Sequence, residues 1–339
     1  QLVMILATNM KPPEIKIIPQ ETEDYKYDFK NIKGQIQARK ASEIAAAGMH
    51  NMLMMGSPGV GKSIIAKTMP SILPDMTLEE QIEISKIQSV AGNLSGSLVK
   101  TRPVRSPHHT ATVSAMIGGG FNPKPGEITQ AHGGILFLDE LPEFSRQVIE
   151  TLRQPLEDEK IIVSRSGGTY EFPAQFILIG AMNPCKCGYY PDMNKCTCTE
   201  QEVKKYMEKI SGPLIDRIDL CVHMNQVTYF QLEKEEQPED SLTIKERVNR
   251  AVQIQRERYA NEKFKFNSQL SGENIKKYCK LNKEEQHLME KIYTTMDLSI
   301  RAYDKIIKVA RTIADLKQHE KIQQGDIAEA VSYRPVLFK

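Results

Sequence analysis

A glycine-rich segment at residues 56–63 has the residue types and the spacing of a phosphate-binding loop. It reads Gly56-Ser57-Pro58-Gly59-Val60-Gly61-Lys62-Ser63 and matches G-x-x-x-x-G-K-S/T at every fixed position. In such a loop the backbone N–H groups turn toward phosphate oxygens, the lysine reaches the β- and γ-phosphates of ATP, and the hydroxyl ligates Mg²⁺. An apolar run precedes the loop and a helix-compatible segment follows it, so a chance glycine turn is a weak alternative.

Two adjacent acids follow a second apolar run, residues 135–138. We expect Asp139 to hold Mg²⁺ together with Ser63, and Glu140 to polarise the attacking water as a general base. Acids at the end of a strand also cap helices. In a chain that already carries a phosphate loop, the Asp-Glu pair favours hydrolysis of ATP over binding alone.

Four of the six cysteines lie close together in the sequence. Cys185 and Cys187 form one C-x-C pair, and Cys196 and Cys198 form another. Four thiolates can hold one tetrahedral, structural Zn²⁺, and the alternative is four reduced thiols in a loop. For Cys221 and Cys279 we expect packing roles. The neighbours His108 and His109 are too close to share one ion readily, so we favour a loop or DNA-contact role for them.

The elements that must position these residues alternate between short apolar runs and helical patterns, which predicts a parallel α/β sheet. We expect strands at 52–55, 135–138, 176–181 and 220–223. Each motif then lies at or beside a strand end, where open α/β sheets bind ligands. Beyond a charged stretch the pattern becomes helical, with helix starts at Asn282 and Ser299. The predicted organisation is a tail at 1–26, an α/β core at 27–225, a charged linker at 226–243 and a helical domain at 244–339.

The overall composition and charge bear on whether the protein binds nucleic acid or a membrane. The chain has 339 residues and a net charge of +2, which gives no global signal for nucleic acid. No apolar run is long enough to cross a bilayer, so we expect a cytoplasmic protein without membrane contact. Because the first residue is Gln1, we also expect the sequence to be part of a longer chain.

Several longer strings resemble one family. They are Arg105-Ser106-Pro107-His108-His109, Gly118-Gly119-Gly120-Phe121-Asn122-Pro123-Lys124-Pro125-Gly126-Glu127-Ile128, Arg153-Gln154-Pro155-Leu156-Glu157 and Ala181-Met182-Asn183-Pro184-Cys185-Lys186-Cys187-Gly188-Tyr189. Over residues 27–335 the sequence is similar to the ComM and YifB family of magnesium-chelatase-like AAA+ ATPases. Magnesium-chelatase motor subunits and MCM helicases are wider relatives. The resemblance implies an AAA+ core with a small all-α lid, ATP and Mg²⁺ as cofactors, and a ring, expected to be a hexamer.

The resemblance also implies roles for three polar residues. Asn183 would be sensor 1, which positions water or senses the γ-phosphate, although an asparagine before proline is also a common turn residue. Arg217 would be the arginine finger that reaches the neighbouring subunit's nucleotide, the alternative being a surface ion pair. Arg301 would be the sensor 2 arginine that touches the γ-phosphate when the lid packs over the site, the alternative being an ordinary helix-surface arginine. Gly34 and Gln35 would lie near the base.

The family further implies that two insertions, residues 100–127 and a hairpin at 160–175, face a central channel. Their basic residues could follow the phosphates of DNA or could be solvated loop charges. They are Lys100, Arg102, Arg105, Lys160 and Arg165. ComM is a DNA branch-migration helicase, and full-length members carry an N-terminal domain like that of Lon proteases, which this sequence does not include. Two alternatives remain: a chelatase-type motor subunit acting on a protein partner, and a nucleotide-dependent scaffold.

Overall fold

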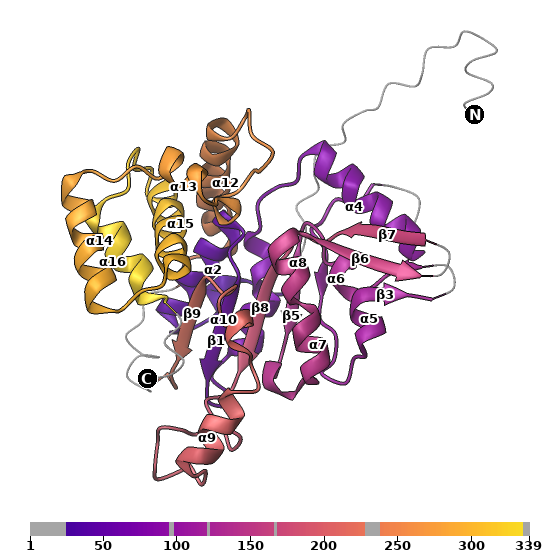
Figure 1. Ribbon diagram of the computed structural model, residues 1–339, viewed down its shortest axis with the longest axis horizontal. Coiled ribbons are helices and arrows are strands. Elements are labelled where there is room, and N and C mark those ends of the chain that lie inside the picture. The colour runs from indigo at the N-terminus through magenta and orange to yellow at the C-terminus, as the bar shows by residue number, and fades with distance from the viewer. Residues whose placement is uncertain (1–24, 95–97, 121–122, 166–167, 228–237, 335–339) are drawn as a thin grey trace.

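The computed structural model describes residues 25–94, 98–120, 123–165, 168–227 and 238–334 (Figure 1). Most of the tail expected at 1–26, the tip of the predicted hairpin and most of the expected charged linker lie outside this part. Within the described residues, no helix is both long and apolar enough to span a membrane.

A five-stranded parallel sheet forms the core, in the order β2-β5-β8-β1-β9. The strands are β1 (Met52–Gly56), β2 (Val104–Arg105), β5 (Ile135–Leu138), β8 (Ile177–Met182) and β9 (Leu220–Met224). The expected parallel α/β fold is therefore confirmed, with all four expected strands within one residue of their predicted ends. Their register aligns Met52 with Ile179 on one side and with Leu220 on the other.

The edge strand β2 was not expected. It lies inside the segment predicted to be a channel insertion, and Val104 pairs with Ile135. Part of that segment therefore belongs to the core sheet. Its two residues carry no detectable alternation, and only the pairing with β5 identifies them as a strand.

Both faces of the sheet are covered, which explains why the central strands are continuously apolar. On one face Met54, Ile179 and Val222 pack into a cluster with α2 and the C-terminal helices. On the other face Leu53, Leu136 and Leu178 pack with the helices that follow β2, β5 and β8. Alternate residues of each strand thus enter opposite cores, as the pleat requires.

The core helices connect these strands. They are α2 (Ile36–Gly48), α3 (Lys62–Thr68), α4 (Leu78–Ala91), α5 (Val113–Ile117), α6 (Glu127–Gln130), α7 (Arg146–Thr151), α8 (Arg153–Asp158), α9 (Glu200–Met207) and α10 (Gly212–Ile215), with 3-10 turns η1 (Phe29–Asn31), η2 (Met69–Ile72) and η3 (Leu141–Glu143). A short pair, β3 (Gly118–Gly119) and β4 (Lys124–Pro125), lies in the first insertion. The predicted hairpin is present as β6 (Lys160–Arg165) and β7 (Gly168–Pro173), which projects beyond the sheet in Figure 1.

The C-terminal part is all helical, as expected. It comprises α12 (Ser241–Arg258), η4 (Asn267–Gln269), α13 (Glu273–Tyr278), α14 (Lys283–Thr295), α15 (Ile300–Leu316) and α16 (Gln324–Ser332). Its first helix begins at Ser241, because the Asp240 side chain caps it by accepting from the backbone N–H of Thr243. The two parts share one apolar cluster, in which α12 and α15 pack on α2.

A buried network of hydrogen-bonded polar side chains also joins the α/β core to the helical C-terminal part. His50, two residues before β1, has Nδ1 3.2 Å from Asp219 Oδ2 and Nε2 2.7 Å from Thr312 Oγ1 on α15. Burial alone would raise the pKa of Asp219, but the nearby Lys308 and His50 hold it at about 2. The helical part is thus fixed to the amino ends of the strands by charged and hydrogen-bonded groups as well as by apolar packing.

Candidate active site

The phosphate loop connects β1 to α3, as the motif requires. Gly59 and Gly61 have φ angles of 80° and 99°, in the left-handed region that glycine tolerates best. This turn carries the backbone from the carboxyl edge of the sheet directly into the first turn of α3, which begins at Lys62. The loop N–H groups and the lysine therefore lie on the side of the sheet where α/β proteins bind phosphates.

Lys62 bridges the phosphate loop and the end of β8. Its Nζ donates to Gly56 O at 2.6 Å, to Ser57 O at 3.0 Å and to Asn183 Oδ1 at 3.0 Å. Desolvation lowers the pKa of Lys62, and the opposing charges of Asp139 and Glu140 limit this effect. The sheet thus brings the predicted lysine and the predicted sensor asparagine into direct contact.

The predicted magnesium ligands also meet. Ser63 Oγ donates to Asp139 Oδ2 at 2.8 Å, across the gap between α3 and the end of β5. Mg²⁺ prefers oxygen ligands and commonly uses one or two protein groups together with substrate phosphates. A hydroxyl and a carboxylate so placed, next to a buried lysine, fit a bound Mg²⁺–ATP.

Glu140 follows with φ of 52°, so the chain turns sharply at the predicted general base. Its side chain remains 59% exposed, and its Oε2 lies 3.5 Å from His109 Nδ1. His109 in turn stacks edge-on against Phe144, with ring centroids 6.5 Å apart. Sequence reasoning assigned His109 to a loop or DNA contact and missed this neighbour. The only signal was a histidine in the segment before β5, which does not specify a partner.

Gln35 reaches the same loop from the start of α2. Its Nε2 donates to Val60 O at 3.0 Å and to Asn225 O at 2.7 Å. Gln35 therefore ties the phosphate loop to the end of β9, beside Gly34. The expectation that this stretch lies near the base of the nucleotide agrees with that position and stays a prediction.

Arg217 lies at the opposite edge of the sheet. Its carbonyl accepts from Asn51 Nδ2 at 3.0 Å, and Asn51 is the residue before β1. Its guanidinium pairs with Glu157 and donates to Pro213 O at 2.9 Å, leaving the side chain 12% exposed. Arg217 therefore lies at the amino ends of the strands, whereas Lys62 lies at their carboxyl ends.

Arg301 is exposed in the first turn of α15, whose start packs against the same amino edge. One turn later, Lys305 Nζ donates to Ile218 O at 2.9 Å and to Ile215 O at 3.3 Å. In Figure 1 the C-terminal helices lie away from α9, which follows the carboxyl end of β8. Arg301 thus lies beside the amino ends of the strands. The sensor 2 role expected for it, contact with the γ-phosphate when the lid packs over the site, stays a prediction.

Two of the basic residues expected in a DNA channel are engaged within the chain. Arg102 is 8% exposed, pairs with Glu80 at 3.1 Å and donates to two backbone carbonyls. Arg105 makes a two-point ion pair with Glu127, at 2.6 and 2.7 Å. The expectation for Arg102 is wrong, because its guanidinium is buried and holds the segment before β2 in place.

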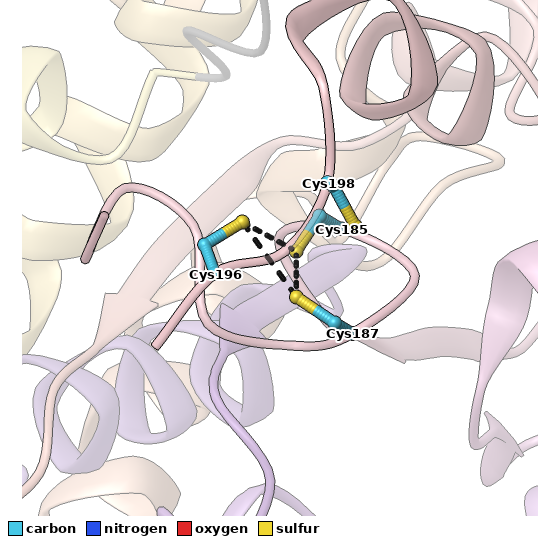
Figure 2. A group of neighbouring side chains, drawn as sticks. All are labelled: Cys185, Cys187, Cys196 and Cys198. Carbon is cyan, nitrogen blue, oxygen red and sulfur yellow. Dashed lines mark hydrogen bonds between the residues drawn. The ribbon is translucent and has the colours of Figure 1, made fainter. Parts of the chain in front are cut away.

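The four clustered cysteines lie in the long connection between β8 and α9. Figure 2 shows their side chains converging from both arms of this loop. All four are free thiols in the structure, and their sulfur atoms all lie within 4.8 Å of one another. Cys221 and Cys279 are buried in the apolar clusters on the two faces of the sheet, in line with the packing roles expected for them.

Comparison with known proteins agrees with this geometry. Residues 28–232 match the family model described as magnesium chelatase, subunit ChlI, and residues 238–334 match its C-terminal model. The chain is 42% identical over 312 residues to competence protein ComM of Haemophilus influenzae and 41% identical over 312 residues to YifB of Escherichia coli, in each case over 91% of this chain. It is 25% identical over 230 residues, 68% of this chain, to the probable DNA helicase MCM9 of Arabidopsis thaliana, of which it covers 29%.

The chain spans about three fifths of ComM and YifB, covering 60% and 61% of their lengths. The residues matched by the two family models include the phosphate loop, the Asp-Glu pair, the hairpin and the C-terminal helices. With its parallel sheet and helical C-terminal part, the chain belongs to the magnesium-chelatase family of AAA+ proteins, in the branch that contains ComM and YifB.

Proposed function

We propose that this chain is the ATP-hydrolysing part of a ring motor that remodels or unwinds DNA, as a branch-migration helicase does. The observation that carries the ATPase assignment is the convergence of three elements at one edge of the sheet. Lys62 contacts Asn183, and Ser63 contacts Asp139. Glu140 stands next to this pair with an exposed carboxylate.

Each of these residues would have its own role in the transfer of the γ-phosphoryl group from ATP to water. Lys62 would bind the β- and γ-phosphates, and Ser63 and Asp139 would hold Mg²⁺, which neutralises developing charge on the phosphate oxygens. Glu140 would accept a proton from the attacking water, and Asn183 would orient that water. A binding-only protein has no use for Glu140, so this set favours turnover.

A ring is supported by the position of the two arginines. Arg217 and the first turn of α15, which carries Arg301, lie at the edge of the sheet opposite the phosphate loop. In a head-to-tail ring that edge faces a neighbouring subunit, so both arginines would serve the neighbour's nucleotide. A hexamer is the size that the family resemblance favours.

DNA as the substrate is supported by the relatives, since one is named a competence protein and another a probable DNA helicase. Within the chain, the projecting β6–β7 hairpin offers an exposed arm, with Lys160 paired to Glu171 at 2.9 Å. Lys100 is exposed and Arg102 is not. We therefore assign DNA contact to the hairpin and Lys100.

The second candidate is a motor that acts on a protein partner, as suggested by the match to the chelatase family models. A third is a nucleotide-dependent scaffold. ATP hydrolysis that DNA does not accelerate favours the protein-directed motor. Stable nucleotide binding without turnover in an assembled ring favours the scaffold.

The ATPase assignment is tested by Glu140→Gln, which keeps the size of the side chain and removes the base. We expect ATP to bind with unchanged affinity and the steady-state rate to fall by about 10²–10⁴-fold. Glu143→Gln is the matched control, because Glu143 lies on the same turn, is exposed and pairs with Lys209 at 3.3 Å. Equal rates for the two variants would refute Glu140 as the base.

A further inference from the structure

The clustered thiols are spaced as ligands of a single ion. Cys185 Sγ lies 3.3 Å from Cys187 Sγ and 3.8 Å from Cys196 Sγ, and the latter two sulfurs are 3.6 Å apart. Cys198 completes the set, with all four sulfurs within 4.8 Å of one another. Around tetrahedral Zn²⁺ with Zn–S bonds of about 2.3 Å, sulfur atoms are roughly 3.8 Å apart.

We propose that the four cysteines bind one structural Zn²⁺ that holds the loop after Asn183 against the phosphate loop. Four thiolates fill a tetrahedral shell and leave no open position for a reacting group, so the site is structural. The sulfur–sulfur distances do not fit a disulfide, in which the two sulfur atoms would be about 2.05 Å apart. The bracing role rests on the proposed ATP site.

The backbone supports thiolate charge at this position. The N–H groups of Gly188 and Tyr190 donate to Cys185 Sγ at 3.3 and 3.4 Å. At the other end of the loop, Thr199 and Glu202 form a capping box at the start of α9, directly after Cys198. The ion would therefore connect the end of β8 to the start of α9.

The connection between β8 and α9 is a long loop without regular secondary structure. Residues 183–199 have no helix or strand, and unstructured loops longer than about 12–15 residues are uncommon in compact domains unless they serve a function. Metal ligands supply the constraint that a small apolar core cannot. Of the four thiols only Cys185 is buried, and the other three are partly buried against the same apolar cluster, so apolar packing covers the loop only in part.

The loop touches the nucleotide site at two places. Asn183, two residues before Cys185, accepts the hydrogen bond from Lys62. Gly188 has φ of 91° and packs so tightly on the phosphate loop that a Cβ there would lie 2.6 Å from Pro58 Cδ. A metal that fixes the ends of this loop would thus fix the distance between sensor and phosphate loop.

The first measurement is the zinc content of the purified chain, by mass spectrometry and by release to a chromogenic chelator after thiol blocking. We expect about one Zn²⁺ per chain. The double variant Cys187→Ser/Cys196→Ser should lose it, whereas Cys279→Ala, which alters a buried thiol outside the cluster, should keep it. A wild-type chain that contains no zinc and takes up none from solution would overturn the proposal.

Because the double variant could fail to fold, the wild-type chain is also stripped with a chelator and reloaded with Co²⁺. Tetrahedral cobalt thiolate should give intense visible bands that Zn²⁺ then abolishes. Titration with a fluorescent ATP analogue should show roughly tenfold weaker binding to the stripped chain and recovery on adding Zn²⁺. Identical affinity in both states would contradict the bracing role.

The proposed zinc site and the proposed ATP site can be tested independently of each other. Lys62→Ala should lose nucleotide binding and keep its zinc, because Lys62 contacts Asn183 and none of the thiols. A wild-type chain that hydrolyses ATP but neither contains zinc nor takes it up from solution would refute the metal site and leave the proposed function intact.

Discussion

Lys62 Nζ lies 3.0 Å from Asn183 Oδ1, which joins two residues that are 121 positions apart in the sequence. This contact exists because β1 and β8 are neighbouring parallel strands that end at the same edge. The predicted phosphate loop and the predicted sensor residue at the end of β8 are therefore in direct contact. A change in the γ-phosphate that moves the lysine would be transmitted to the end of β8 and to the cysteine loop beyond it.

We predict that Lys62→Ala weakens ATP binding by at least about 100-fold, or roughly 2.7 kcal/mol. The variant loses the ammonium that pairs with the phosphates and the contact that holds Asn183. Calorimetric or fluorescence titration with ATP measures the effect. Lys67→Ala is the control, since Lys67 lies on the same helix and is exposed. Wild-type affinity in Lys62→Ala would disprove the assignment of the phosphate loop.

We predict that Arg217→Ala keeps ATP affinity and lowers the turnover rate by about 10³-fold or more, the usual effect of removing an arginine finger. Arg153→Ala, which removes a surface partner of Glu150, should leave the rate unchanged. The rate is measured with ATP in excess over its dissociation constant.

Mixing the two inactive variants tests whether Arg217 acts between subunits. In a mixed ring, an Arg217→Ala subunit supplies Glu140 and its Glu140→Gln neighbour supplies Arg217, so some sites become complete. We expect partial recovery of ATP hydrolysis when the two are assembled together. Mixed rings, verified by mass, that stay inactive would argue that both residues serve the same subunit.

Asp219 should make stability depend on pH at the acidic end. Its pKa is about 2 in the folded chain against 3.8 as the ordinary value, so its stabilising contribution is present above about pH 4 and is lost as the pH falls toward 2. We predict that Asp219→Asn costs on the order of 2 kcal/mol at pH 7 and progressively less from pH 5 to pH 3. Urea unfolding across this range checks it.

Asp216→Asn is the control for that experiment, because Asp216 is exposed three residues away. It should be as stable as the wild-type chain throughout the range. A stability gap for Asp219→Asn that stays constant down to pH 3 would contradict the role of the Asp219 carboxylate charge.

Most of the candidate site at the carboxyl ends of the strands is predictable from the sequence, because each part of it has a short sequence pattern of its own. A continuous apolar run followed by glycines or acids identifies a buried parallel strand and its ligand-binding end, as at Gly56 and Asp139. The Cys-x-Cys pairs predict their own convergence in the same way, since each is short and the loop between them can fold back.

The remaining features depend on contacts between distant segments, which no local pattern encodes. Val104 is a strand residue only because it pairs with Ile135. Arg102 reads as a free loop charge, yet tertiary packing buries it against Glu80. The position of Arg301 depends on which edge of the sheet α15 meets, and the helical periodicity of α15 says nothing about that edge.

Steady-state ATP hydrolysis, measured with and without single-stranded and forked DNA and with Glu140→Gln as the blank, distinguishes a DNA motor from the alternatives. We predict hydrolysis that depends on Glu140 and rises several-fold with DNA, most with the forked substrate. Hydrolysis that depends on Glu140 and is the same with every DNA would contradict a DNA motor and favour a protein-directed one.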